Sequence, residues 1–167
     1  PAALAQEMEL HVIPLTVIID GKQYLNYLDE RELTIKRCYA MLREGRSATS
    51  AAVNVEQFTQ AMEPYLQQGK DILYLGFSSG LSSTYSAGVL AATQLMERYP
   101  ERKIYASDTL CASLGQGMLV YLAVQQKQAG KTIQQVRDYV EATKLNLCHW
   151  FTVDDLHHLR RGGRVSI

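Results

Sequence analysis

The stretch of this chain best suited to ligand binding or catalysis is rich in glycine and in residues with hydroxyl side chains. Residues 76–84 read Gly-Phe-Ser-Ser-Gly-Leu-Ser-Ser-Thr, after an apolar run over 71–75 and before a helical pattern over 85–99. This order predicts a strand, a polar loop and a helix. The first N–H groups of a helix lack intrahelical acceptors, and the helix dipole favours negative charge there. The stretch therefore fits an anion site, and it equally fits a plain helix cap by Ser82 or Ser83.

Ser78 also lies in a G-x-S-x-G pattern between the predicted strand and helix, which is typical of a nucleophile elbow. The acid and base of a serine hydrolase would then be Asp154 or Asp155 with His157 or His158. An acid and a base on one short helix make a poor triad, because the imidazole must reach the serine from a separate loop. A serine esterase is the enzyme alternative.

Asp154, His157 and His158 have spacings that could place metal ligands on one helix face. No convincing third ligand accompanies them, so we expect a solvated helix face and no metal. Residues 76–84 also lack the G-K-[ST] and G-x-G-x-x-G patterns of nucleotide sites, and we expect no cofactor.

Three arginines near the C-terminal end, Arg160, Arg161 and Arg164, flank the pair Gly162-Gly163. Forked guanidinium donors beside glycine suit a phosphate or a carboxylate. An ordinary helix C-terminus explains the same residues equally well, because the dipole favours arginine there and the cap favours glycine.

Composition limits the classes of protein that the chain can be. Its 167 residues are 47% hydrophobic and carry 17 basic and 17 acidic side chains, which predicts one globular domain over residues 1–167 and no general attraction to nucleic acid or anionic membranes. The cysteines, at 38, 111 and 148, have no C-x-x-C spacing, and we expect reduced thiols in a cytoplasmic protein. No run reaches the roughly 18 apolar residues of a membrane helix, and the N-terminus does not read as a signal peptide.

The elements that must position these residues alternate between strand and helix. Asp20-Gly21 predicts a hairpin turn, and residues 46–52 read as a loop. Later strands are predicted over 71–75, 103–107 and 148–153, with helices between them. This pattern predicts an α/β fold whose open parallel sheet has helices on both faces. The loops at 76–84, 108–113 and 154–164 should then converge at the carboxyl ends of the strands, where such sheets bind ligands.

Four motifs, in order, resemble the DegV family of bacterial fatty-acid-binding proteins. They are Thr49-Ser50; Ser78-Ser79-Gly80-Leu81-Ser82-Ser83-Thr84-Tyr85; Ser107-Asp108 with Ala112-Ser113-Leu114-Gly115-Gln116-Gly117; and Val153-Asp154-Asp155-Leu156 leading to Arg161-Gly162-Gly163-Arg164-Val165-Ser166. The resemblance implies the lipid-carrying subunit of a fatty acid kinase. Such a subunit is not itself an enzyme: it holds a long-chain fatty acid while a separate kinase phosphorylates the carboxylate.

The same resemblance implies that Thr49 and Ser82 bind the fatty acid carboxylate. Going beyond the motif match, we infer that the three arginines lie near the kinase or its phosphates. Ala51-Ala52 stands where the family usually has Gln-Pro, and Ser83 stands where it usually has glycine. The family also has an earlier strand with an Asp-Ser motif and a second domain that contributes to the acyl pocket. We therefore expect residues 1–167 to be an N-terminal α/β domain truncated at both ends. A plain interaction domain is the third hypothesis.

Overall fold

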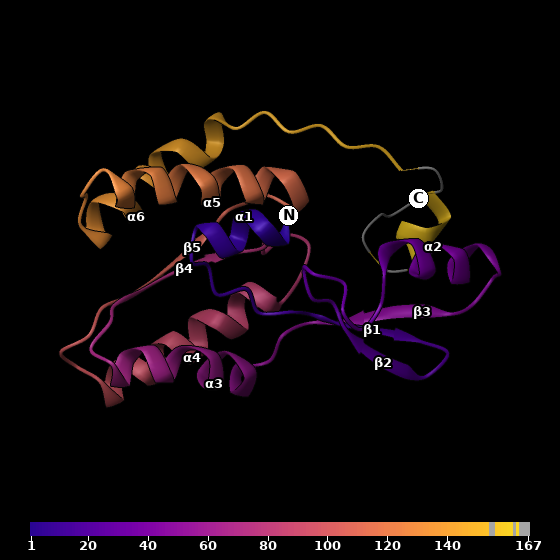
Figure 1. The fold of residues 1–167 in the computed structure, drawn as a ribbon, viewed down its shortest axis with the longest axis horizontal. Coiled ribbons are helices and arrows are strands. Elements are labelled where there is room, and N and C mark those ends of the chain that lie inside the picture. The colour runs from indigo at the N-terminus through magenta and orange to yellow at the C-terminus, as the bar shows by residue number, and fades with distance from the viewer. Residues whose placement is uncertain (154–155, 162, 164–167) are drawn as a thin grey trace. The chain divides into compact units, whose positions relative to one another are not determined.

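The computed structural model describes residues 1–153, 156–161 and 163. The chain divides into two compact units, residues 1–53 and residues 54–167. Each unit has its own β-sheet, and the described residues supply three strands to the first and two to the second (Figure 1).

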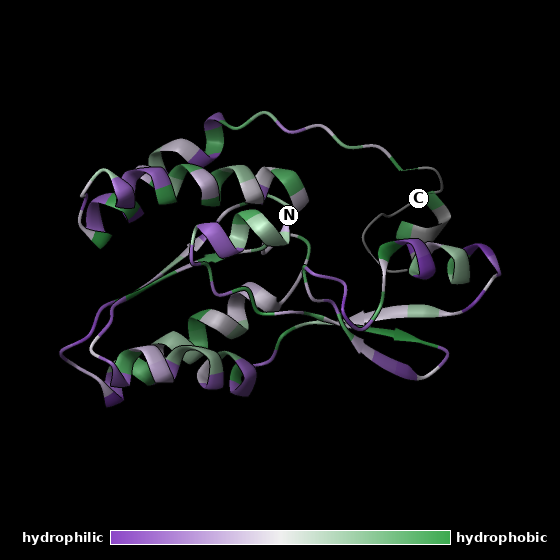
Figure 2. Ribbon diagram, viewed as in Figure 1, coloured by the Kyte–Doolittle hydropathy of each residue, from purple (hydrophilic) through white to green (hydrophobic). Residues whose placement is uncertain are grey.

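A β-hairpin forms the centre of the first unit. Strands β1 (Thr16–Ile19) and β2 (Lys22–Leu25) pair in antiparallel register, with Thr16 opposite Leu25. Asp20 and Gly21 both have positive φ, 50° and 81°, as the two central residues of a type I′ turn require. The predicted hairpin turn is confirmed. Strand β1 is the apolar strand of the pair (Figure 2).

The predicted loop over 46–52 is wrong, because Ala48–Ala51 forms strand β3 on the other edge of β1. Its register places Thr49 opposite Ile18. Alanine and serine are weak strand formers, so the local sequence gives little signal for this strand. The free edge of β1 supplies the hydrogen-bonding partner that the local sequence does not reveal.

Two helices complete the first unit. Helix α1 covers Ala2–Glu7 and α2 covers Ile35–Arg43. The Thr34 side chain caps α2 by accepting a hydrogen bond from the Arg37 N–H, and the helix ends before Gly45, whose φ is 82°. Threonine and glycine are favoured at these two positions for these reasons.

The second unit contains a parallel strand pair covered on both faces by helices. Strands β4 (Ile72–Gly76) and β5 (Ile104–Asp108) are joined through α4 (Thr84–Arg98). Helices α3 (Val55–Gln67) and α4 pack together on one face of the pair, and α5 (Ser113–Gln128) and α6 (Ile133–Thr143) pack on the other (Figure 1). The α/β class with helices on both faces of a parallel sheet is confirmed.

Two helices of this unit begin with capping boxes that the sequence specifies. Asn54 and Gln57 exchange hydrogen bonds at the start of α3, and Thr132 and Gln135 do so at the start of α6. Each box satisfies two N–H groups that the helix itself leaves unpaired.

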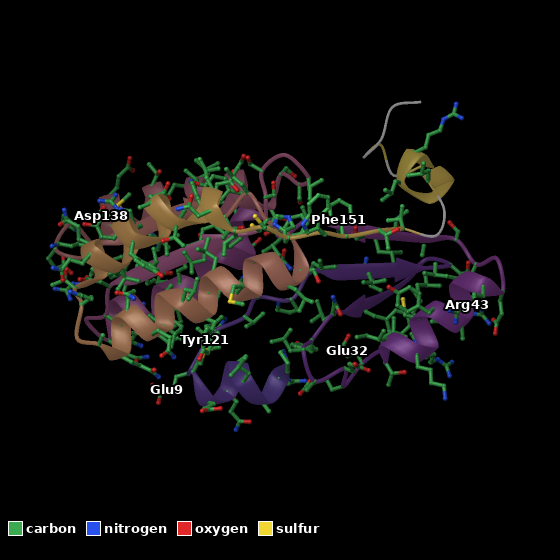
Figure 3. The ribbon with its side chains drawn as sticks, turned by 90° about the horizontal axis from the view of Figure 1, so that it is seen from above. Glu9, Glu32, Arg43, Tyr121, Asp138 and Phe151 are labelled. Atoms are coloured by element: carbon green, nitrogen blue, oxygen red, sulfur yellow. The ribbon has the colours of Figure 1, made fainter. Side chains whose placement is uncertain are left out.

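The predicted strand over 148–153 is wrong. After a short 3-10 turn, η1 (Lys144–Asn146), the chain continues without a ladder partner in the described part of the sequence. Trp150 and Phe151 are 96% and 78% exposed. Figure 3 shows Phe151 on this segment. Aromatic and β-branched residues favour a strand, but a strand forms only where another edge accepts it. Helix α7 (Leu156–Arg161) follows.

The core of the second unit lies between the strand pair and its helices. Leu119, Ala123, Val136 and Val140 form a buried cluster between α5 and α6, and Leu73 and Leu75 of β4 pack against it. Burying one such large apolar side chain contributes roughly 1.5–3 kcal/mol. This packing holds β4 against α5, and so fixes where the loop after β4 begins.

Aromatic rings fill the opposite face of β4. The Tyr74 ring contacts Phe58 at 5.0 Å and Tyr85 at 6.0 Å between centroids. A Cβ atom added to Gly88 of α4 would lie 2.5 Å from Tyr74 Cε1. Only glycine therefore lets α4 approach this ring.

We expect Gly88→Ala to destabilise the chain by roughly 1–3 kcal/mol, because it overpacks a filled site. Gly117→Ala is the matched control, since a Cβ there meets nothing within 4 Å in the middle of α5. The control should instead stabilise the chain by roughly 0.5–1 kcal/mol through its higher helix propensity. Urea unfolding of both variants measures the difference, and equal effects of the same sign would contradict this close packing.

Candidate functional site

The loops after β4 and β5 are joined by hydrogen bonds at the carboxyl ends of the two strands. The Thr109 hydroxyl, fully buried, donates to the Gly76 carbonyl at 2.7 Å, and the Thr109 N–H donates to the same oxygen at 3.2 Å. The Ser78 N–H donates to the Cys111 carbonyl at 3.0 Å. Two of the three loops that we expected to converge therefore lie together. The third, 154–164, lies partly outside the described residues.

Asp108, the last residue of β5, organises this junction through its side chain and its carbonyl. Its carboxylate accepts hydrogen bonds from the N–H groups of Ser79, at 3.2 Å, and Leu110, at 3.0 Å. Lys144 Nζ donates to the Asp108 carbonyl at 3.1 Å and pairs with the Glu141 carboxylate at 2.6 Å.

These contacts also set the charge of the Asp108 side chain. Burial acts to raise the pKa of the Asp108 carboxyl, but the hydrogen bonds from Ser79 and Leu110 and the nearby Lys144 ammonium outweigh it, so the pKa lies below its usual value. A negative charge therefore stays on this loop at neutral pH.

The loop after β4 uses most of its own N–H groups to hold its shape. Besides Ser78 and Ser79, the N–H groups of Leu81 and Ser82 are also bonded, both to the Ser78 carbonyl, at 3.0 and 3.2 Å. Residues 78–82 thus form a separate turn ahead of α4. Several of the backbone N–H groups that the sequence suggested for anion binding are therefore occupied, and the hydroxyl groups of the loop are further donors.

Ser82 lies one residue before the N-cap position of α4 and bonds to the first N–H group of the helix, much as a cap would. Its Oγ, partly buried, accepts a hydrogen bond from the Thr84 N–H at 3.2 Å and lies 2.9 Å from Thr84 Oγ1. Ser83, the residue at the N-cap position, makes no side-chain cap. When Thr84 Oγ1 is the donor of the hydroxyl pair, the Ser82 proton is available to a ligand. The cap and a ligand contact are therefore compatible.

Thr49, the other predicted carboxylate ligand, lies on β3 of the first unit and is exposed. Its position on the strand is fixed by the pairing of β3 with β1.

Ser78 does not have the geometry of a nucleophile elbow. Such an elbow is a sharp, strained turn that leads directly into a helix. Here α4 begins only at Thr84, and Ser78 is not among the described residues with positive φ. Of the proposed triad partners, Asp154, Asp155 and the side chains of His157 and His158 lie outside the described residues.

The described residues contain no group of three or more His, Cys, Asp or Glu side chains that could hold a metal ion. Arg160 and Arg161 lie on α7, with Arg160 exposed, and Arg164 lies outside the described residues. No helix in the described part of the chain is both long and apolar enough to cross a bilayer.

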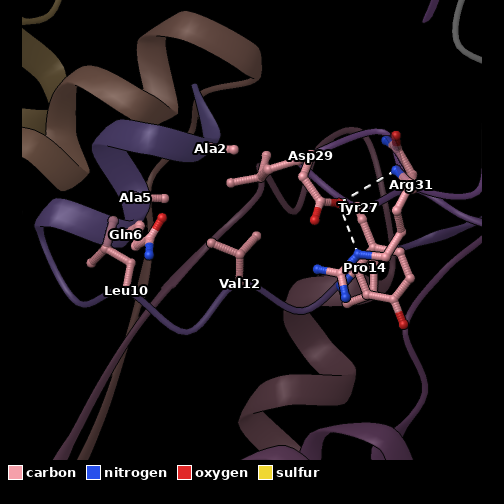
Figure 4. A pocket seen from close by; sticks show the side chains of 11 residues that line it. Ala2, Ala5, Gln6, Leu10, Val12, Pro14, Tyr27, Asp29 and Arg31 are labelled. Atoms are coloured by element: carbon pink, nitrogen blue, oxygen red, sulfur yellow. Dashed lines mark hydrogen bonds and ion pairs between the residues drawn. The ribbon is translucent and has the colours of Figure 1, made fainter. Parts of the chain in front are cut away.

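A cleft in the first unit was not suggested by any sequence pattern. It has a volume of about 360 Å³ and lies between α1 and residues 26–31 (Figure 4). Arg31 Nε donates to the Asp29 carboxylate at 2.8 Å, and the Arg31 guanidinium stacks over the Tyr27 ring at 4.1 Å. Because Asp29 already pairs with this cation, the cleft offers a carboxylate ligand no unpaired charge.

A protein-family model matches this chain over its whole length. The family model described as "Uncharacterised protein, DegV family" matches residues 1–167. The chain belongs to the DegV family. The resemblance found in the sequence motifs is confirmed.

Members of the DegV family match the chain over nearly all of its length. A DegV domain-containing protein of Clostridium perfringens is 45% identical over 166 residues, which are 99% of this chain and 57% of that protein. The structure of a DegV family protein from Thermus thermophilus, described by its fatty acid binding, matches with a TM-score of 0.84 and 30% identity over 98% of this chain and 56% of its own.

A more distant DegV-like fold belongs to the Fatty Acid Kinase (Fak) B3 protein of Streptococcus pneumoniae, solved with linoleic acid. It matches with a TM-score of 0.70 and 20% identity over 79% of this chain and 45% of its own. The chain thus spans about half the length of the relatives that it matches.

Asp108→Asn tests the junction of the two loops. Because the folded-state pKa of Asp108 is lowered, its carboxylate contributes stability above the unfolded-state pKa of about 3.9. That contribution is lost as the pH falls through the lower, folded-state pKa. We therefore expect Asp108→Asn to be less stable than the wild type at pH 7, with the difference shrinking towards pH 3. Urea unfolding across this range measures it.

The exposed carboxylate of Asp138 on α6 provides the control. Asp138→Asn removes an exposed ion pair and should lower the stability at pH 7 less than Asp108→Asn does. A difference between Asp108→Asn and the wild type that stays constant from pH 7 to pH 3 would contradict an ionised Asp108 at the junction.

Proposed function

We propose that this chain forms part of a long-chain fatty acid carrier that presents the carboxylate of the lipid to a separate kinase, which converts it to an acyl phosphate. Family membership supports the lipid, since the Thermus thermophilus relative, 30% identical to this chain, is described by fatty acid binding. The kinase partner is suggested by the Streptococcus pneumoniae protein, whose name makes it part of a fatty acid kinase and which holds linoleic acid.

The observation that carries the proposal is the hydroxyl-rich loop at the carboxyl end of β4. Its N–H groups hold the loop itself, and the Ser82 hydroxyl stands partly buried at the start of α4. Among the described residues, no histidine or carboxylate is bonded to the Ser82 hydroxyl. A hydroxyl without a base is a weak nucleophile, and it is a good donor to a carboxylate.

We propose Ser82 and Thr49 as the residues that bind the carboxylate. Ser82 has the geometric support given above, and Thr49 follows from its motif and from its exposed position on β3. The role requires no cofactor, because the carrier binds the lipid and leaves the chemistry to the kinase.

Ser82→Ala and Thr49→Val should each weaken fatty acid binding. A hydrogen bond to a charged acceptor contributes roughly 1.5–3 kcal/mol, so we expect about a ten- to hundredfold rise in Kd by calorimetry. Ser83→Ala is the matched control, because Ser83 makes no side-chain cap. If the two hydroxyls share one carboxylate, the effects of the double variant should not add.

A fatty alcohol of the same length separates head-group recognition from folding. Ser82→Ala should leave alcohol binding nearly unchanged. Equal weakening for acid and alcohol would mean that Ser82 acts only as a helix cap, whose loss costs about 1 kcal/mol of stability.

Arg160, Arg161 and Arg164 are proposed to face the kinase. Charge reversal at Arg161 or Arg164 should lower the rate of acyl phosphate formation, and lower it most at low salt, while lipid binding stays intact. Arg43→Glu, at an exposed arginine of α2, is the control. A parallel loss of lipid binding would instead place these arginines at the lipid itself.

A further inference from the structure

The hydroxyl group of Ser78 has no hydrogen-bonding partner among the described residues, although the residue is only 8% exposed. Serine hydroxyls this deeply buried are usually bonded. Ser78 Oγ is not among the polar atoms that the protein seals from solvent without a partner. Ser78 therefore holds a donor that is shielded from bulk solvent and still accessible.

The direction of this hydroxyl follows from Gly80. A Cβ atom added to Gly80 would lie 3.6 Å from Ser78 Oγ and would meet no other atom within 4 Å beyond the adjoining residues. The Ser78 hydroxyl thus faces the open side of the Gly80 backbone. Because Gly80 has no side chain, a small open space, which we call the cradle, lies next to the Ser78 hydroxyl group.

The backbone around Ser78 is already fully engaged. Its N–H donates to the Cys111 carbonyl, and its own carbonyl accepts hydrogen bonds from Leu81 and Ser82. The turn leads into the N-terminus of α4, a helix of 15 residues whose dipole favours a negative group there. Only the side chain of Ser78 is free to bind.

We propose that Ser78 is a further donor to the carboxylate of the bound lipid, beside Ser82; this inference rests on the proposed function. A carboxylate has two oxygens, each able to accept more than one hydrogen bond, so two hydroxyl donors from one turn can serve it. The ligand supplies the acceptor that the protein does not. Ser78 in this role binds and performs no nucleophilic attack.

This role has a distinctive energetic consequence. A buried hydroxyl without a partner lowers the stability of the ligand-free protein, and its removal relieves that cost. Ser78→Ala should therefore leave the melting temperature of the ligand-free chain unchanged or raise it, while it weakens binding of the acid. A serine with a structural role would behave in the opposite way, because its removal lowers the melting temperature.

The experiment compares Ser78→Ala with Ser83→Ala in thermal melts and in calorimetry with hexadecanoic acid and hexadecanol. Ser83 is the matched control, because it is exposed and its side chain makes no cap hydrogen bond. We expect Ser78→Ala to raise Kd for the acid about tenfold or more, with little change for the alcohol. Ser83→Ala should change neither.

Gly80→Ala is a second variant, which keeps the serine and fills the cradle. Its methyl group would lie 3.6 Å from Ser78 Oγ, an ordinary contact that the fold tolerates. It should weaken acid binding while the melting temperature changes little.

Several results would overturn the inference. Unchanged acid binding by Ser78→Ala, with Ser82→Ala impaired, would remove Ser78 from the site and leave the proposed function intact. A lower melting temperature with equal loss of acid and alcohol binding would make Ser78 structural. Covalent labelling of Ser78 by a fluorophosphonate would make it a nucleophile. Failure of the wild type to bind hexadecanoic acid, measured in a protein of the full length of its relatives, would overturn the proposed function as well.

Discussion

The pairing of β4 with β5 is the constraint on which the second unit depends. Thr109 extends this pairing one residue beyond the strands, because both its N–H and its hydroxyl bond to the Gly76 carbonyl. Only parallel strands that end in register bring the two following loops to the same edge of a sheet. Gly76 lies opposite Asp108, so each loop starts at the same level and can bond to the other. The packing of β4 against α5 and α6 on one face, and of the Tyr74 ring on the other, holds that register in place.

At this edge the backbone and the side chains have different tasks. The N–H groups of Ser78, Ser79, Leu81 and Ser82 all bond to acceptors within the protein. The acceptor for Ser79 is the ionised carboxylate of Asp108. Fewer backbone donors are therefore left at this loop, and its hydroxyl groups add to them. Serine suits this arrangement because its hydroxyl can accept one hydrogen bond from the protein and still donate another to a ligand. Ser82 shows the first half of this behaviour in its bond from Thr84.

In the first unit, the pairing of the strands determines the face of the sheet on which each side chain lies. Strand β1 supplies two edges, and β2 and β3 occupy one each. Because side chains alternate between the two faces of a strand, the pairing of Thr49 with Ile18 determines the face to which Thr49 belongs. A shift of one residue would place Thr49 on the opposite face. The hairpin turn at Asp20-Gly21 protects against such a shift between β1 and β2, since its length and handedness fix their register.

The sequence by itself determined the features that depend on near neighbours in the chain. The capping boxes at Asn54 and Thr132, the hairpin turn and the strand–loop–helix order at residues 76–84 were predictable, because each is decided by residues within a few positions. The tertiary structure decided what depends on distant partners. Strand β3 formed from a weak local signal because β1 offered an edge, whereas residues 148–153, with a strong local signal, found no edge in the described chain. Likewise, the sequence identified Ser78 and Ser82 as candidate residues, but only folding across 29 to 36 positions brought Asp108 to Ser79 and Lys144 to Asp108, and so settled which donors of the loop remain free.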